Sequence, residues 1–268
     1  MEVEGGSDRK IAVLIYELVG TCILTYVTLI SKGEFYAIGG VYLCLLYICW
    51  NVSGGHFNPA LSVSVYIGQK NFGGNIVTLA MMLGAQVVGA FLGLFWAWLT
   101  LMNKDYMKAV YGDDPDHLVP PGFVFDVCPT VTGVGCDTGE AKYGFSRDFQ
   151  TFFAVLIISI FNYFVYQATK NKETANTDNE VVKMFICYVS FNASANALRY
   201  FGTLGFNPLL TVMIVIFKVS QTDGTASPWA HYLWVYILVP IFAAGAAGVL
   251  HLMHVKGTQK GDGGQSYE

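Results

Sequence analysis

Long apolar stretches separated by short polar segments make up most of the chain, and few charges interrupt them. Runs close to 20 apolar residues match the thickness of the bilayer hydrocarbon, so the pattern predicts membrane-spanning helices. A soluble helical core would instead show amphipathic faces with charges every few residues, which this pattern lacks. The six predicted spans are Ile11–Ile30, Tyr36–Val52, Ile76–Leu101, Phe149–Thr169, Val181–Leu198 and Tyr232–His254.

Composition supports this interpretation and narrows the function. The chain is 54% hydrophobic and 13% charged, against about 25% charged residues in ordinary soluble domains. Its mean hydropathy is +0.47. Neither end carries the Lys/Arg cluster of a nucleic-acid or anionic-lipid site. No phosphate loop, metal-ligand spacing or nucleophile–base arrangement stands out, so we predict no enzymatic activity, cofactor or metal.

The spans form one membrane domain that is built from two halves and has polar ends. No signal-peptide cleavage site precedes the first span, and the Gly-rich C-terminal end is predicted to be a disordered tail. Placing both termini in the cytosol divides the 15 Lys and Arg residues almost equally between the two sides, so the positive-inside rule favours neither orientation. We nevertheless expect both termini in the cytosol, in a plasma or an internal membrane. The predicted parts are the N-terminus 1–10, the membrane domain 11–254, its repeats 11–101 and 149–254, the outer loop 103–147 and the tail 255–268.

A short sequence occurs twice and relates the two halves. The segment Phe57–Val63, Phe-Asn-Pro-Ala-Leu-Ser-Val, recurs as Phe206–Val212, Phe-Asn-Pro-Leu-Leu-Thr-Val. Each copy leads into an apolar segment too short to cross a bilayer. Three spans and one short segment, repeated, indicate an inverted repeat, because an odd number of spans turns the second copy upside down. The two short segments therefore enter from opposite faces and meet near the middle of the membrane.

Asn-Pro suits the start of such a short helix. Asn is a strong N-cap, and Pro fits the first helical position because its missing N–H needs no partner there. Asn58-Pro59 and Asn207-Pro208 thus start two half-helices whose positive ends, each roughly half an elementary charge, point at one another. The Gly-rich loops before them offer free carbonyls and amides to a passing solute.

These motifs resemble those of the aquaporin, or major intrinsic protein, family. The run Ser53–Ala60, Ser-Gly-Gly-His-Phe-Asn-Pro-Ala, is similar to the family's first signature, and Glu17 and Gln86 also match. The resemblance extends over residues 11–254. It implies an all-α membrane protein, with six transmembrane helices and two re-entrant half-helices in a right-handed bundle. It also implies a pore in each subunit of a homotetramer, for water or small neutral solutes.

Three polar residues are candidates for supporting the pore loops. A carboxylate within a membrane is costly unless it is paired, so Glu17 is expected to accept hydrogen bonds from the backbone N–H groups of a re-entrant loop. Gln150 is predicted as its neutral counterpart in the second half. His56 is expected to line the pore or support its loop, rather than to sense pH.

The second motif departs from the family pattern. Asn207-Pro208-Leu209-Leu210 replaces the family's Asn-Pro-Ala-Arg, so the filter Arg is absent. By resemblance and spacing, the filter falls at four apolar positions. Arg199 is the nearby cation; it either reaches the outer mouth or ends the fifth span at the interface. The predicted filter positions are Ile38, Ala195, Leu204 and Leu210.

Such an apolar filter leaves three functions open. The first is a passive channel with a wider neck, for water, ammonia, hydrogen peroxide or glycerol-like solutes. The second is a structural or adhesion subunit whose apolar ring excludes water and keeps the pore shut. The third is an ion-leaky channel, because the missing Arg removes one barrier to cations.

Two cysteines lie in the predicted outer loop. Cys128 and Cys136 are close enough in sequence to form a disulfide if that face of the membrane is oxidising. Closing this short loop would add about 2–3 kcal/mol of stability in the chain-entropy model.

Overall fold

The computed structural model describes residues 7–31, 33–69, 76–101, 145–199, 201, 204–221 and 233–261. Within these ranges the chain is entirely helical apart from turns and loops, as the long apolar stretches predict. The helices are α1 (Ser7–Ile30), α2 (Phe35–Cys49), α3 (Pro59–Gly68), α4 (Ile76–Leu101), α6 (Phe145–Lys170), α7 (Glu180–Ala197), α8 (Pro208–Gln221) and α10 (Leu233–Gly261).

Four of the described helices are long and apolar enough to cross a membrane by length and composition. They are α1, α4, α6 and α10. Helices α2 and α7, of 15 and 18 residues, do not meet the same criterion of length and apolar composition. Helices α3 and α8 have 10 and 14 residues. At 1.5 Å per residue they are about 15 Å and about 21 Å long, too short for a hydrocarbon core of about 30 Å.

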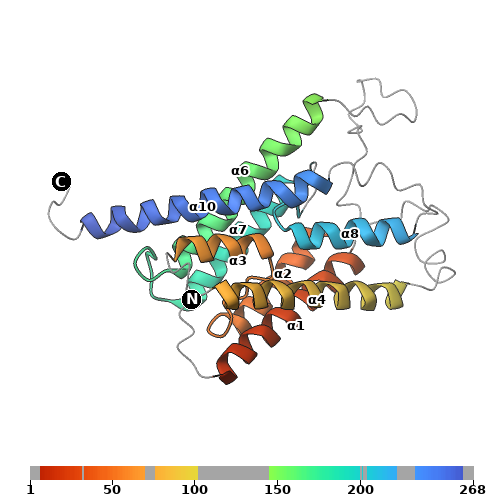
Figure 1. The fold of residues 1–268 in the computed structure, drawn as a ribbon, viewed down its shortest axis with the longest axis horizontal. Coiled ribbons are helices and arrows are strands. Elements are labelled where there is room, and N and C mark those ends of the chain that lie inside the picture. The colour runs from red at the N-terminus through yellow and green to blue at the C-terminus, as the bar shows by residue number, and fades with distance from the viewer. Residues whose placement is uncertain are drawn as a thin grey trace.

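The two short helices start near the centre of the bundle and run apart from there (Figure 1). Each begins with a proline, and the asparagine before that proline is its N-cap. Asn58 Oδ1 accepts from Ala60 N at 3.0 Å, and Asn207 Oδ1 accepts from Leu209 N at 3.2 Å. The same cap chemistry starts α7, where Asn179 accepts from the amides of Val181 and Val182. Local sequence therefore fixes where these helices begin.

Glycines allow the closest helix contacts. A Cβ atom added at Gly89 of α4 would lie 2.2 Å from the carbonyl oxygen of Leu18, so α1 and α4 pack backbone against backbone at this point. At Gly248 of α10, an added Cβ atom would lie 2.7 Å from the Ile67 side chain and 3.0 Å from the Ser64 carbonyl oxygen, both of α3. Small residues at such positions permit the van der Waals packing that holds membrane helices together.

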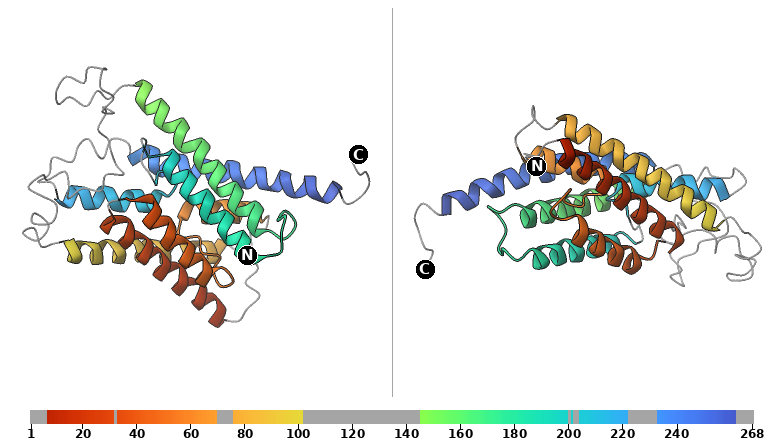
Figure 2. Two further views of the ribbon diagram at one scale, coloured as in Figure 1. Left: turned by 180° about the vertical axis from the view of Figure 1, so that it is seen from behind. Right: turned by 90° about the horizontal axis from the view of Figure 1, so that it is seen from below.

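The C-terminal helix is longer than the sequence indicates. Helix α10 continues to Gly261, although the sequence predicts that the span ends at His254 and that the tail is disordered from residue 255. Its C-terminal end projects beyond the other helices (Figures 1 and 2). The prediction of disorder is therefore wrong for 255–261, because the helix extends past its apolar part; residues 262–268 lie outside the described ranges.

Candidate functional site

The site is centred on the two Asn-Pro motifs, which the structure brings together. Asn58 Nδ2 donates to the backbone carbonyl of Phe206 at 3.0 Å, and Asn207 Nδ2 donates to that of Phe57 at 3.0 Å. Each asparagine thus caps its own half-helix with its oxygen and bonds the opposite loop with its nitrogen. The side chains are buried, at 4% exposed for Asn58 and 1% for Asn207.

The loop before α3 has an irregular backbone. Gly54, Gly55 and Phe57 have φ values of 90°, 70° and 47°, in the left-handed region that residues with a Cβ atom rarely adopt. Because the backbone is not helical here, the amides of His56 and Phe57 do not bond to a carbonyl four residues earlier as they would in a helix. Buried amides need acceptors, because each unpaired polar group in an apolar environment costs free energy.

Glu17 of α1 supplies those acceptors. Its Oε1 accepts from His56 N at 3.0 Å and its Oε2 from Phe57 N at 2.9 Å. Gln86 of α4 donates its Nε2 to Glu17 Oε2 at 2.8 Å and to Ser62 Oγ at 3.0 Å. The carboxylate therefore lies among hydrogen-bond donors, in the geometry expected for a residue that supports the loop.

His56 is held from two sides. Its Nδ1 lies 3.1 Å from Ser62 Oγ of α3, and its ring meets the Tyr166 ring edge-on, with centroids 5.4 Å apart. Both contacts tie the imidazole to neighbouring helices. Of the roles that we considered for His56, loop support is the one that these contacts favour.

The second loop lacks the predicted counterpart of Glu17. Gln150 is exposed on α6, so it lies outside the buried network that we predicted for it. Besides Asn58, which donates to the Phe206 carbonyl, and Tyr236, whose hydroxyl donates to the Phe201 carbonyl, two further side chains contact the second loop. The Tyr163 hydroxyl donates to the Phe206 carbonyl, and Thr211 Oγ1 donates to the Leu204 carbonyl at 3.2 Å.

Two tyrosines of α6, which no sequence motif marks, also contact these loops. Besides the contact of Tyr163, the Tyr166 hydroxyl donates to the Gly54 carbonyl of the first loop at 2.7 Å. The available signal was two tyrosines three positions apart in a mostly apolar span, which places them on one face of the helix. That spacing alone does not reveal which backbone groups they reach.

The four predicted filter positions come from three elements and the second loop. Ile38 lies on α2, Ala195 on α7 and Leu210 on α8, and all belong with Leu204 to one apolar cluster. Each is 1% exposed or less. We call these four residues the filter ring. In the described conformation, the side chains of the filter ring are almost completely inaccessible to water.

Of the remaining candidates, the structure describes only Arg199. Arg199 is exposed just after α7, as expected for an interfacial residue. Cys128 and Cys136 fall outside the described residues. In the part of the chain that the structure describes, no three His, Cys, Asp or Glu residues cluster as metal ligands would.

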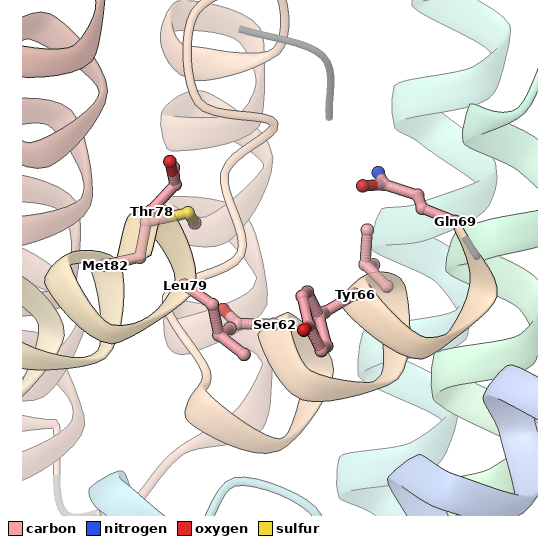
Figure 3. Close-up of a pocket in the computed structure, with 7 residues that line it drawn as sticks. Ser62, Tyr66, Gln69, Thr78, Leu79 and Met82 are labelled. Carbon is pink, nitrogen blue, oxygen red and sulfur yellow. The ribbon is translucent and has the colours of Figure 1, made fainter. Parts of the chain in front are cut away.

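A pocket lies beside α3 rather than at the Asn-Pro pair (Figure 3). It opens between α3 and α4, and apolar atoms dominate its lining. Its lining residues are Ser62, Val65, Tyr66, Gln69, Thr78, Leu79 and Met82. Neither Asn58 nor Asn207 lines this pocket.

Two half-helices meeting end to end within a bundle of longer apolar helices define a membrane channel of the inverted-repeat type. The sequence model of one family, described as Major intrinsic protein, matches residues 11–251. The chain therefore belongs to the major intrinsic protein family, whose members are aquaporin-like channels and not enzymes.

Individual relatives are distant but cover most of the chain. Aquaporin PIP2-4 of Oryza sativa subsp. japonica is 23% identical over 235 residues, which are 86% of this chain and 69% of that protein. Aquaporin PIP2-7 of Arabidopsis thaliana is 24% identical over 259 residues, covering 89% of this chain and 79% of that protein. These matches agree with the family assignment.

A solved structure shares the fold. The X-ray structure of the aquaglyceroporin from Plasmodium falciparum superposes with a TM-score of 0.61 at 13% sequence identity. The match covers 90% of this chain and 95% of that one. The predicted all-helical membrane fold and the predicted family are therefore confirmed.

Proposed function

We propose that this chain is a passive channel for water and small uncharged solutes, with the filter ring as its narrowest point. The observation that carries the proposal is the pair of reciprocal bonds between Asn58 and Asn207 and the opposite loops. An amide nitrogen has two hydrogens, and each bond uses one. In the proposed channel the second hydrogen of the Asn207 amide donates to a solute that passes between the half-helices, while the Asn58 side chain is also in hydrogen-bond contact with the Tyr163 hydroxyl.

The electrostatics of the same site favour neutral solutes. The positive ends of α3 and α8 face one another, so a cation at the waist meets roughly half a charge from each side. The filter ring adds no charge and no hydrogen-bond donor from its side chains. Small Ala195 beside three aliphatic residues supports a neck for solutes such as ammonia, hydrogen peroxide or glycerol-like molecules.

The channel is tested by reconstituting the full chain in vesicles and measuring osmotic swelling, solute uptake and electrical current. We expect swelling faster than in protein-free vesicles, uptake of at least one small neutral solute, and no current. Swelling no faster than in bare lipid, with no uptake, would contradict the proposal.

Replacing Leu210 tests the position of the filter. Leu210→Arg is expected to narrow the neck and to lower the uptake of the larger solutes relative to water. The matched control is Leu210→Met, because this exchange nearly conserves volume and adds no charge. An unchanged solute profile in Leu210→Arg would show that the filter lies elsewhere.

One observation favours a second function, a structural or adhesion subunit with a closed pore. All four residues of the filter ring are 1% exposed or less, as in an apolar constriction that excludes water. The same vesicles decide between the two functions. Current through the wild-type protein would instead favour the third function, an ion-leaky channel.

We also propose a homotetramer with both termini in the cytosol. Large apolar side chains are exposed on several helices, with Tyr47 at 73% and Phe242 at 64%, as surfaces facing lipid or another subunit require. The mass of the detergent-solubilised complex, corrected for detergent, tests the tetramer. Protease accessibility of a C-terminal tag in sealed vesicles of known orientation tests the topology.

A further inference from the structure

The two tyrosines of α6 bond to the backbone of both pore loops. Tyr163 and Tyr166, which we call the tyrosine pair, are 0% and 3% exposed and lie on one face of α6. The Tyr163 hydroxyl donates to the carbonyl of Phe206, one residue before Asn207. The Tyr166 hydroxyl donates to the carbonyl of Gly54, four residues before Asn58. One helix thus contacts the loops of both repeats.

The bond of Tyr163 uses up the acceptor capacity of Phe206. A carbonyl oxygen has two lone pairs. At Phe206 one of them accepts from Asn58 Nδ2 at 3.0 Å, and the other accepts from the Tyr163 hydroxyl. A solute at the waist therefore finds no free acceptor on this carbonyl while Tyr163 keeps its place.

The position of Tyr166 depends on a glycine. A Cβ atom at Gly54 would lie 2.8 Å from the Tyr166 hydroxyl oxygen, closer than real Cβ contacts allow. The backbone of Gly54 is also in the left-handed region, with φ of 90°. Gly54 thus presents its carbonyl to the hydroxyl without steric conflict.

Aromatic rings contact the Tyr166 ring and the Phe206 ring. The Tyr166 ring meets His56 and Trp50 edge-on, with centroids 5.4 Å and 6.1 Å apart. On the side of the second loop, the Phe191 ring lies edge-on to Phe206 at 5.2 Å and stacks on Tyr42 at 4.4 Å. Tyr166 is therefore packed among rings as well as hydrogen-bonded, and the Phe206 residue that Tyr163 bonds is itself held by an aromatic neighbour.

We propose that the tyrosine pair is the gate of this channel. Its hydroxyls hold the loop carbonyls that a permeating solute needs as acceptors, and its rings occupy space next to them. A solute passes when it donates hydrogen bonds to these carbonyls in place of the hydroxyls. The pair therefore selects small molecules with O–H or N–H donors. This inference rests on the proposed channel function and adds the residues that limit the rate.

Removing only the hydroxyls tests the gate. Tyr163→Phe and Tyr166→Phe keep the rings and free the carbonyls. A hydrogen bond of typical net strength changes an equilibrium by up to about tenfold. We expect each variant to raise swelling and solute uptake by up to about that factor, and the double variant to exceed both. The matched control is Tyr26→Phe, since the Tyr26 hydroxyl contacts only Thr100 at 3.2 Å among the bonds identified, away from the loops.

A second variant separates the gate from the proposed channel function. Tyr163→Leu together with Tyr166→Leu removes both rings and hydroxyls, and its folding is checked by melting temperature and monodispersity in detergent. If the wild type is impermeable and this variant conducts, the gate is supported and the wild type is a closed channel. If the wild type conducts and all folded tyrosine variants conduct equally or less, the gate is overturned and the channel function stands. If neither the wild type nor any folded variant conducts, both proposals fail.

Discussion

The ammonium group of Lys170 lies 3.7 Å from the centre of the Trp50 ring and donates to the Trp50 carbonyl at 2.5 Å. Trp50 follows the last residue of α2, and Lys170 is the last residue of α6. The Trp50 indole N–H in turn donates to Glu180, the first residue of α7. Glu180 also pairs with Lys183 at 3.0 Å. The ends of three helices are thus joined through one buried tryptophan.

Lys170→Met is expected to loosen this junction. It keeps most of the side-chain volume but removes the cation from the ring and the hydrogen bond from the carbonyl. Together these interactions are worth about 1–3 kcal/mol. The apparent melting temperature in detergent should fall. The control Lys172→Met alters an exposed side chain in the next loop and should leave that temperature unchanged; equal melting of both variants would contradict the prediction.

Glu17→Gln should destabilise the first pore loop. The carboxylate accepts from two backbone amides and from Gln86, whereas an amide has only one oxygen and presents N–H groups to the other donor. We expect a loss of about 2–4 kcal/mol in stability, seen as a lower melting temperature, and reduced permeability. Asp178→Asn, at an exposed loop position, is the control. Normal melting and transport of Glu17→Gln would refute its supporting role.

Two glycines of α4 provide a matched pair for testing helix contact. Gly89→Ala places a methyl group 2.2 Å from the Leu18 carbonyl oxygen, whereas nothing lies within 4 Å of a Cβ atom at Gly84. Gly89→Ala should cost about 1–3 kcal/mol through forced separation of α1 and α4. Gly84→Ala should be neutral or stabilising by up to about 1 kcal/mol through helix propensity. Melting temperatures in the reverse order would contradict the close packing.

Asn207→Asp separates the two tasks of the asparagine. Aspartate keeps the acceptor that caps α8 but cannot donate to Phe57, and it introduces a buried negative charge. We expect a loss of about 1–3 kcal/mol in stability and lower permeability for neutral solutes. The control is Asn179→Asp at the exposed N-cap of α7, where a carboxylate is favourable. If both variants behave like the wild type, the bond across the two loops contributes nothing measurable.

Sequence alone was sufficient wherever a local rule acts. The caps at Asn58 and Asn207 follow from helix-start preferences, and the position of Glu17 follows from the cost of an unpaired carboxylate in a membrane. The caps depend only on residues within a short motif. The place of Glu17 depends on its need for hydrogen-bond donors, which a re-entrant loop supplies. Contacts between residues far apart in the sequence were harder to predict.

Gln150 and the tyrosine pair illustrate that limit. No motif fixes the rotation of α6 about its axis, and an error of about two residues, roughly half a turn, moves a polar residue from the core to the surface. The sequence therefore placed Gln150 in a buried role although it is exposed. The partners of Tyr163 and Tyr166 are 43 and 112 positions away in sequence, and no spacing rule connects them.

The exchange of amide bonds between the two loops has a consequence for biogenesis. While the ribosome has delivered only the first repeat, the Phe57 carbonyl and the Asn58 nitrogen lack the partners that they have in the finished protein. Neither half is thus a complete folding unit. The waist closes only after Asn207 has entered the bilayer, so assembly of the conduit is a late event that the second repeat completes.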